Sequence, residues 1–246
     1  MEPSEYKMMF EVEDRHWWYV GMQRLTLRLL HQVYGEVANL AILDAGCGTG
    51  AAATYLSVFG TVASLDFSSL ALSFCQQRGL QHLSQGTITQ LPFAAASFDL
   101  ITSFDVLYHR AVGDYRVALA EFYRVLKPGG HIFLRLPAYN WLRGHHDEVI
   151  HTERRFSVGE CRQALAETGF FNEKISYANS LLFPAAAGKR IFDRLVPPGS
   201  EQSDVKPNPA WQDTLLAGIL GWEARWLNYF NLPFGLSVIA LSRKPG

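Results

Sequence analysis

Short apolar runs alternate with amphipathic segments from residue 40 onward. Four amphipathic segments have the apolar spacing or the flanking signals of helices: residues 51–59, 69–79, 115–126 and the stretch from Ser157 to about Thr168. Six apolar runs have the length of strands: residues 40–45, 62–67, 98–104, 131–137, 171–178 and 236–242. Because strands and helices that alternate in this way form βαβ units, we expect a largely parallel sheet.

End signals support two of these helices. The third helix is followed by Lys127-Pro128-Gly129-Gly130, where proline cannot extend a helix and the glycines permit a tight turn into the next strand. Ser157 with Glu160 three residues later forms a capping box, and Gly169 ends the helix that this box begins.

Two regions fall outside the alternation. We therefore divide the single domain into an N-terminal helical cap (1–39), an α/β core (40–178), a helical insertion (179–234) and a closing strand (235–246). The insertion carries large apolar side chains at near-helical spacing: Trp211, Leu215, Trp222, Trp226 and Tyr229. Such a stripe is typical of a core or a subunit interface, and a roof over a substrate pocket is the alternative. A membrane-surface contact has weaker support, because this helix lacks a face rich in Lys and Arg.

A glycine-rich turn joins the first strand to the first helix. Gly46, Gly48 and Gly50 alternate with other residues, so the backbone can turn sharply and approach a ligand closely. The spacing is G-x-G-x-G, which differs from the G-x-G-x-x-G of dinucleotide binders. Asp66 ends the second strand, where an acidic side chain can accept hydrogen bonds from both hydroxyls of a ribose. Together the turn and the acid indicate a nucleoside ligand, although each alone also occurs in ordinary turns.

An ordered series of motifs narrows the predicted nucleoside ligand to one protein family. The segments 42–50, Asp66, 91–93 with 97–100, and 126–130 resemble those of class I S-adenosylmethionine-dependent methyltransferases, over roughly residues 36–137. The resemblance implies a doubly wound, Rossmann-like α/β fold. Its sheet would have seven mostly parallel strands, with an N-terminal helical lid and a helical insertion before the last strand. It also implies S-adenosylmethionine as cofactor and methyl transfer to oxygen or nitrogen of a small molecule.

The resemblance also implies cofactor-binding residues. Trp18 would belong to the lid, where aromatic faces favour the positive sulfonium, and Arg24 would meet the methionine carboxylate. A helix that packs on the sheet through its tryptophans is the alternative, and both can hold together. The family often has an acidic residue near the adenine where this chain has Thr87 and Ile88, so backbone carbonyls or a hydroxyl would substitute. The other expected contacts lie around the methionine, ribose and adenine groups: Asp44, Ala45, Gly46, Cys47, Gly48, Asp66, Phe67, Ser68, Phe104, Asp105 and Val106.

The acceptor side is marked by polar residues after the fourth and fifth strands. His109 is a candidate general base, with a substrate contact or a structural histidine as alternatives. Arg154 and Arg155 could hold a carboxylate or phosphate, or pair with acidic side chains. We favour substrate contacts over a metal site, and expect no metal, for the remaining candidates: Tyr139, His145, His146 and His151.

Composition narrows the class of partners. The formal net charge is −1 and no basic stripe is evident, so we expect no nucleic-acid partner. The three cysteines have neither disulfide nor zinc spacing. No secretory signal and no apolar run of about 20 residues is evident, so we expect a cytoplasmic monomer or homodimer.

The breadth of apolar surface suits a bulky or apolar methyl acceptor. Two other functions stay open. The chain could bind the cofactor without catalysis, as a regulatory protein. A nicotinamide-dependent oxidoreductase fits the βαβ unit and Asp66 but not the glycine spacing.

Overall fold

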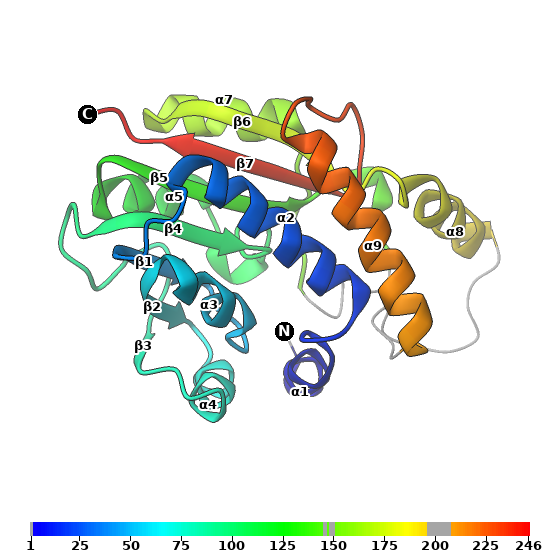
Figure 1. The fold of residues 1–246 in the computed structure, drawn as a ribbon, viewed down its shortest axis with the longest axis horizontal. Helices are drawn as coiled ribbons and strands as arrows, with labels where there is room; N and C mark the ends of the chain where they lie inside the picture. The colour runs from blue at the N-terminus through cyan, green and yellow to red at the C-terminus, as the bar shows by residue number, and fades with distance from the viewer. Residues whose placement is uncertain (1, 145–146, 148–150, 196–207) are drawn as a thin grey trace.

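The computed structural model describes residues 2–144, 147, 151–195 and 208–246. Its centre is a seven-stranded sheet with the strand order β3-β2-β1-β4-β5-β7-β6 (Figure 1). The first five strands pair in parallel, whereas β7 runs antiparallel to both β5 and β6. The strands are β1 (Leu40–Ala45), β2 (Gly60–Asp66), β3 (His82–Gln85), β4 (Phe98–Phe104), β5 (Leu126–Pro137), β6 (Phe171–Ala178) and β7 (Ser237–Arg243).

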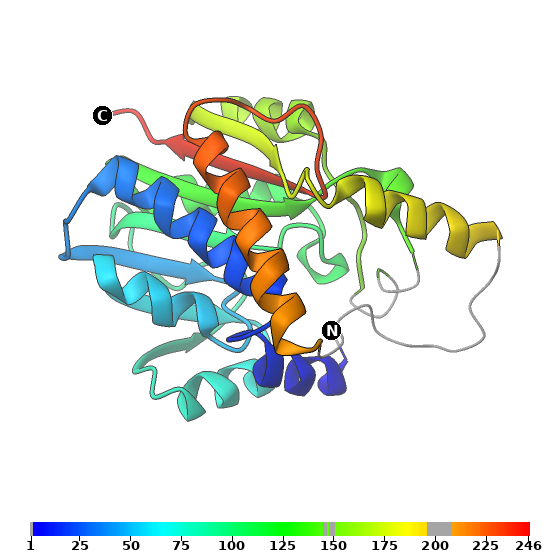
Figure 2. The same cartoon turned by 45° about the vertical axis from the view of Figure 1, so that its right-hand side comes forward.

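Helices cover both faces of the sheet. α2, α3 and α9 lie on one face, α5 and α7 lie on the other, and α1 lies beside α4 at the open edge (Figures 1 and 2). This arrangement is the doubly wound α/β fold that the sequence predicted. The bounds are α1 (Pro3–Val12), α2 (Trp17–Tyr34), α3 (Ala51–Leu56), α4 (Ser69–Gln77), α5 (Tyr115–Val125), α7 (Val158–Thr168), α8 (Phe183–Leu195) and α9 (Ala210–Leu227).

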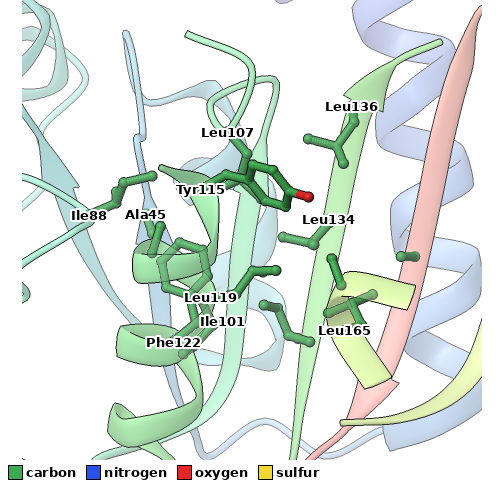
Figure 3. Packing of buried hydrophobic residues seen from close by; sticks show 14 of the residues in the cluster. Ala45, Ile88, Ile101, Leu107, Tyr115, Leu119, Phe122, Leu134, Leu136 and Leu165 are labelled. Atoms are coloured by element: carbon green, nitrogen blue, oxygen red, sulfur yellow. The ribbon is translucent and has the colours of Figure 1, made fainter. Parts of the chain in front are cut away.

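Each face has its own hydrophobic core. Leu119 and Phe122 of α5 and Leu165 of α7 pack against β4 and β5 in one cluster (Figure 3). Leu25 of α2 and Leu227 of α9 belong to the cluster on the opposite face. Because both faces of the central strands are buried, their sequences read as continuous apolar runs.

The predicted end signals are confirmed. Ser157 and Glu160 make both hydrogen bonds of the capping box at the start of α7, and Gly169 ends that helix in a left-handed conformation with φ of 103°. Lys127-Pro128-Gly129-Gly130 lies after the end of α5, at the beginning of β5.

Two local differences have physical causes. None of the six expected strand runs corresponds to β3, because this edge strand has four residues and no fully buried side chain, so it lacks the apolar signal of a strand. α3 ends at Leu56 and a 3-10 turn, Ser57–Phe59, completes the segment that we expected to be one helix.

The aromatic stripe of the insertion does not form a core. α9 buries its opposite side, with Ala217, Leu220, Ala224 and Leu227 packed inward. The exposed fractions of the stripe are 65% for Trp211, 57% for Leu215, 63% for Trp222, 47% for Trp226 and 77% for Tyr229. The core interpretation was therefore wrong, because spacing shows that residues share a face but not which way the face points. No described helix is long and apolar enough to cross a membrane.

Candidate functional site

A cavity of about 1310 Å³ lies at the carboxyl ends of β1, β2, β4 and β5. Ligands of open α/β sheets bind at this edge. α1, the first turn of α2 and α8 contribute further walls. The volume exceeds the roughly 300–1,000 Å³ of a typical small-molecule site, so two ligands have room side by side.

The glycine-rich turn forms part of the cavity floor. Gly46, Gly48 and Gly50 have φ values of 83°, 55° and 89°, which residues with a Cβ rarely adopt. The backbone N–H groups of Gly46 and Cys47 donate to the Leu65 carbonyl at 2.7 and 3.0 Å, which fixes the turn to β2. A Cβ on Gly46 would overlap the Val106 side chain.

Asp66 is held by the same turn. Its Oδ2 accepts from the Gly48 N–H at 2.9 Å, and its Oδ1 accepts from the Ser68 N–H at 2.9 Å. Burial raises the pKa of the Asp66 carboxyl, while these backbone donors oppose the rise. Each carboxylate oxygen carries two lone pairs, so both can accept a further hydrogen bond from a ligand hydroxyl.

Asp44 has a buried oxygen without a hydrogen-bond partner. Its Oδ1 accepts from the Thr102 hydroxyl at 2.9 Å, but its Oδ2 has no partner among the described residues. Burial raises the pKa of this carboxyl to about 7. A buried polar atom without a partner is costly, and a donor on a bound ligand would satisfy it.

α1 closes this part of the cavity from outside. The Glu13 side chain accepts from the Thr49 hydroxyl and from Arg78 Nη2, the latter at 2.9 Å. Phe10 packs on Phe74 of α4, with ring centroids 4.9 Å apart. These contacts hold α1 across the glycine-rich turn.

A buried cation, Arg135, also lines the cavity. Arg135 donates to Asp105 Oδ2 at 2.6 Å. Its guanidinium lies 4.7 Å from the Trp18 ring centroid and 4.8 Å from that of Phe104. The aromatic face of Trp18 that we expected to favour a sulfonium is therefore occupied by a guanidinium of the protein itself.

His109 lines the cavity beyond Asp105. Its Nδ1 accepts from the Ala111 N–H at 3.1 Å, so in the neutral ring the proton lies on Nε2. Burial, with smaller contributions from the positive charges of the N-terminus, His151 and Arg110, lowers the pKa of His109 to about 4. A general base needs a nitrogen with a free lone pair, and the lone pair of His109 Nδ1 already accepts from the backbone. This geometry fits a structural histidine better than a general base.

Two arginines meet one acid in the outer wall. Arg155 binds Asp147 through two hydrogen bonds of 2.8 and 3.0 Å, and Arg190 Nη1 lies 3.7 Å from Asp147 Oδ2. Gly144 permits this approach, since a Cβ there would overlap the Arg190 guanidinium. Among the described residues, no group of three or more His, Cys, Asp or Glu side chains could hold a metal ion.

Comparisons with known proteins agree with this geometry. Residues 43–134 match the family described as "Methyltransferase domain". A demethylmenaquinone methyltransferase of Lactiplantibacillus plantarum is 36% identical over 129 residues, 48% of this chain and 50% of that protein. A fatty-acid O-methyltransferase of Mycolicibacterium smegmatis is 34% identical over 121 residues, 45% of this chain and 42% of that protein. The chain spans about half the length of these curated relatives.

One solved structure extends the likeness to the whole fold. A methyltransferase in complex with the Haloferax volcanii Trm112 methyltransferase activator covers 99% of this chain and 94% of its own length, with a TM-score of 0.64 and 20% identity. The family match spans β1 to β5 and includes the glycine-rich turn and Asp66. Residues 43–134 of the α/β core are therefore a class I S-adenosylmethionine-dependent methyltransferase domain.

The methyltransferase domain brings most of the expected site residues to one cavity. Ala45 is the exception near the turn, since it is buried behind the wall and its carbonyl accepts from the Ser103 hydroxyl at 2.8 Å. The expected residues that line the cavity are Trp18, Asp44, Gly46, Cys47, Gly48, Asp66, Phe67, Ser68, Thr87, Ile88, Phe104, Asp105, Val106 and His109.

Three expected contacts of the methyltransferase domain lie elsewhere. Arg24 is outside the cavity wall and its Nη1 donates to the Ala217 carbonyl of α9 at 3.4 Å, because it lies on the outward side of α2. Tyr139 stacks on Tyr177 with centroids 4.9 Å apart. His151 Nε2 lies 3.3 Å from Glu2 Oε1, beside the start of α1. His145 and His146 lie outside the described residues.

The sequence analysis did not predict several other residues that line the cavity. Tyr6 and Met9 of α1, and Glu13 directly after this helix, line the wall, although α1 is far from every family motif. Arg190 of α8 also lines the cavity. Neither helix carries a local chemical signature, and only the fold brings them to the carboxyl edge of the sheet. The Glu13–Arg78 pair could not be found from spacing, since its members are 65 residues apart.

Proposed function

We propose that this chain transfers a methyl group from S-adenosylmethionine to oxygen or nitrogen of a small, apolar acceptor. The observation that carries the proposal is that Oδ2 of Asp44, in a cavity that also holds Asp66, has no hydrogen-bond partner in the part of the chain that the structure describes. The ammonium of the cofactor's methionine group is a donor of the kind that this oxygen lacks. The two oxygens of Asp66 have acceptor capacity for the ribose hydroxyls.

The adenine would lie beyond Asp66, beside Phe67 and Ser68. The Thr87 hydroxyl is already within 2.7 Å of the Thr89 hydroxyl, so we assign the contact with the adenine amino group to backbone carbonyls of 87–88. When bound, the cofactor supplies a methyl group on a positively charged sulfur. The acidic side chains Asp44, Glu13 and Asp66 favour a cation in this part of the cavity.

The acceptor would occupy the outer part of the cavity. Val112, Leu142, Ala186 and Leu236 give this part apolar walls. The domain would act by holding the acceptor in line with the methyl group and by excluding water, which suffices for nucleophiles that are already unprotonated. We assign His109 an orienting role, because its Nδ1 accepts from a backbone N–H.

Arg190 supports acceptors that carry an acidic group. Its guanidinium lines the outer wall and is aligned by Asp147. The two curated relatives described above are named for demethylmenaquinone and for fatty acids, both largely apolar molecules. A screening panel should therefore contain long-chain carboxylic acids, quinols and apolar amines.

Two measurements test the proposal. Calorimetry with S-adenosylhomocysteine should give a saturable signal that Asp66→Ala abolishes, while NAD gives none. Radiolabelled S-adenosylmethionine should then transfer its methyl group to at least one member of the panel. Tight cofactor binding without transfer to any acceptor would favour the non-catalytic alternative, and binding of NAD alone would overturn the cofactor assignment.

A further inference from the structure

The solvent-facing side of α9 is the largest feature that the proposed function leaves unexplained. We call it the α9 face, and it consists of Trp211, Leu215, Trp222, Trp226, Tyr229 and Phe230. With about 200 Å² per aromatic side chain, its five rings expose roughly 600 Å². This area is at the upper end of what a monomeric protein leaves exposed in one patch, about 300–600 Å².

The orientation of this face is fixed by packing. Gly21 of α2 lies against Leu220 of α9, and any Cβ on Gly21 would overlap that leucine. Glu223 is buried and its carboxylate accepts from the backbone N–H groups of Asn179, Ser180 and Leu181. Both contacts fix the inward side of α9, so its aromatic side must face solvent.

The neighbouring helix supplies positive charge. α2 and α9 lie side by side on the same face of the sheet (Figures 1 and 2). Their exposed charged side chains are all cationic: Arg24, Arg28 and Arg225. Of their two acidic residues, Glu223 is buried, and Asp213 is partly buried and accepts from the Trp17 N–H at 3.1 Å. α2 thus adds two arginines to the one that α9 carries.

We propose that the α9 face, with the arginines of α2, docks on the surface of a membrane that contains anionic lipids. Tryptophan and tyrosine rings partition to the headgroup level of a bilayer, and arginines beside them pair with lipid phosphates. An apolar face flanked by cations is the pattern of helices that lie in the plane of a membrane. A protein partner would not require that every exposed charge on both helices be positive.

The docked face adjoins the cavity. Asp213 ties the first turn of α9 to Trp17, which lines the cavity together with Trp18. A membrane beneath α9 would therefore lie next to the cavity wall, where an apolar molecule dissolved in lipid could reach it. The docking itself is independent of the methyl-transfer proposal, because it concerns a surface outside the cavity.

Co-sedimentation with vesicles tests the proposal. We expect the whole chain to bind phosphatidylcholine vesicles that contain phosphatidylglycerol, and to bind pure phosphatidylcholine more weakly. Trp222→Ser with Trp226→Ser should lower the partition coefficient about tenfold or more on both. Arg28→Gln and Arg225→Gln should each lower it about fivefold on the anionic vesicles alone. The matched control is Val117→Ser on α5, which removes a side chain of 47% exposure from the other face of the sheet.

S-adenosylhomocysteine binding serves as the folding check, since the α9 variants lie outside the cavity and should keep it. Equal vesicle binding by the double tryptophan variant and the wild type would overturn the proposal. Failure of the wild type to bind either vesicle would do so too. A wild-type dimer in light scattering that the same variant converts to monomer, with no vesicle binding, would assign the face to a second copy instead.

Discussion

The buried carboxyl of Asp44 makes a specific prediction about pH. Burial raises its pKa from 3.8 to about 7, and the hydrogen bond from the Thr102 hydroxyl offsets only part of that rise. A carboxyl whose pKa is higher in the folded state than in the unfolded state stabilises the folded state. This contribution is full at pH values below the unfolded-state pKa. Stability is then lost as pH rises toward the folded pKa. A rise in pKa from 3.8 to about 7 changes the free energy of unfolding by about 4 kcal/mol in total. Roughly 2–3 kcal/mol of this change falls between about pH 5 and pH 8.

The variant Asp44→Asn isolates this contribution. An asparagine side chain can still accept from the Thr102 hydroxyl but cannot ionise, so other titrating groups affect both proteins equally. Urea unfolding without ligand should show that the wild type loses about 2–3 kcal/mol relative to the variant between about pH 5 and pH 8. Parallel stability curves for the two proteins would refute the reasoning.

Ligand binding should reverse the rise in the pKa of Asp44. A ligand ammonium at Oδ2 lowers the pKa of Asp44, so S-adenosylhomocysteine should release protons when it binds near pH 6. Calorimetry in buffers of different ionisation enthalpy measures that release, and Asp44→Asn should abolish it.

Three further outcomes follow from local geometry. Gly46→Val should cost about 2–4 kcal/mol in urea unfolding, because its φ is positive and a Cβ would overlap Val106. Glu223→Gln should cost about 2 kcal/mol, since three backbone donors, two of them buried, lose a charged acceptor. His109→Asn should keep the thermal midpoint of the wild type, whereas His109→Ala should lose about 1 kcal/mol, because asparagine replaces the Nδ1 acceptor for the Ala111 N–H.

Each of these has its own check. A Gly46→Val protein as stable as Gly113→Val, whose glycine also has a positive φ but no neighbour within 4 Å, would show that Val106 does not restrict the turn. Equal stability of Glu223→Gln and the wild type would show that the Glu223 carboxylate does not hold α9 in place. If turnover of the wild type has an inflection near pH 6.5 that His109→Asn removes, the low pKa of His109 is wrong.

The sequence was sufficient for the parts of the molecule that have local signals. The capping box at Ser157, the glycine-rich turn and the buried strands each carry their signature within a few residues, and the structure has them where expected. The cavity wall around Asp66 follows from the same turn, because adjacent parallel strands end at one edge.

Other features depended on contacts between distant segments. Spacing placed Trp211 and Trp222 on one helix side, but the packing of α9 on α2 and the hydrogen bonds of its buried Glu223 determine that this side faces solvent. Arg24 was expected in the cavity from a motif position, yet the rotation of α2 directs it to Ala217. Arg190 has no motif, and its place beside Asp147 results from the path of α8.

The distribution of tryptophan gives the protein built-in optical probes. Trp17 and Trp18 line the cavity, whereas Trp211, Trp222 and Trp226 face solvent on α9. Iodide should quench the emission of the second group far more than that of the first. In a Trp141→Phe variant, which removes the remaining half-exposed tryptophan, residual emission in iodide would report on events in the cavity and the quenched fraction on events at the outer helix. The two surfaces can then be followed in one unlabelled sample.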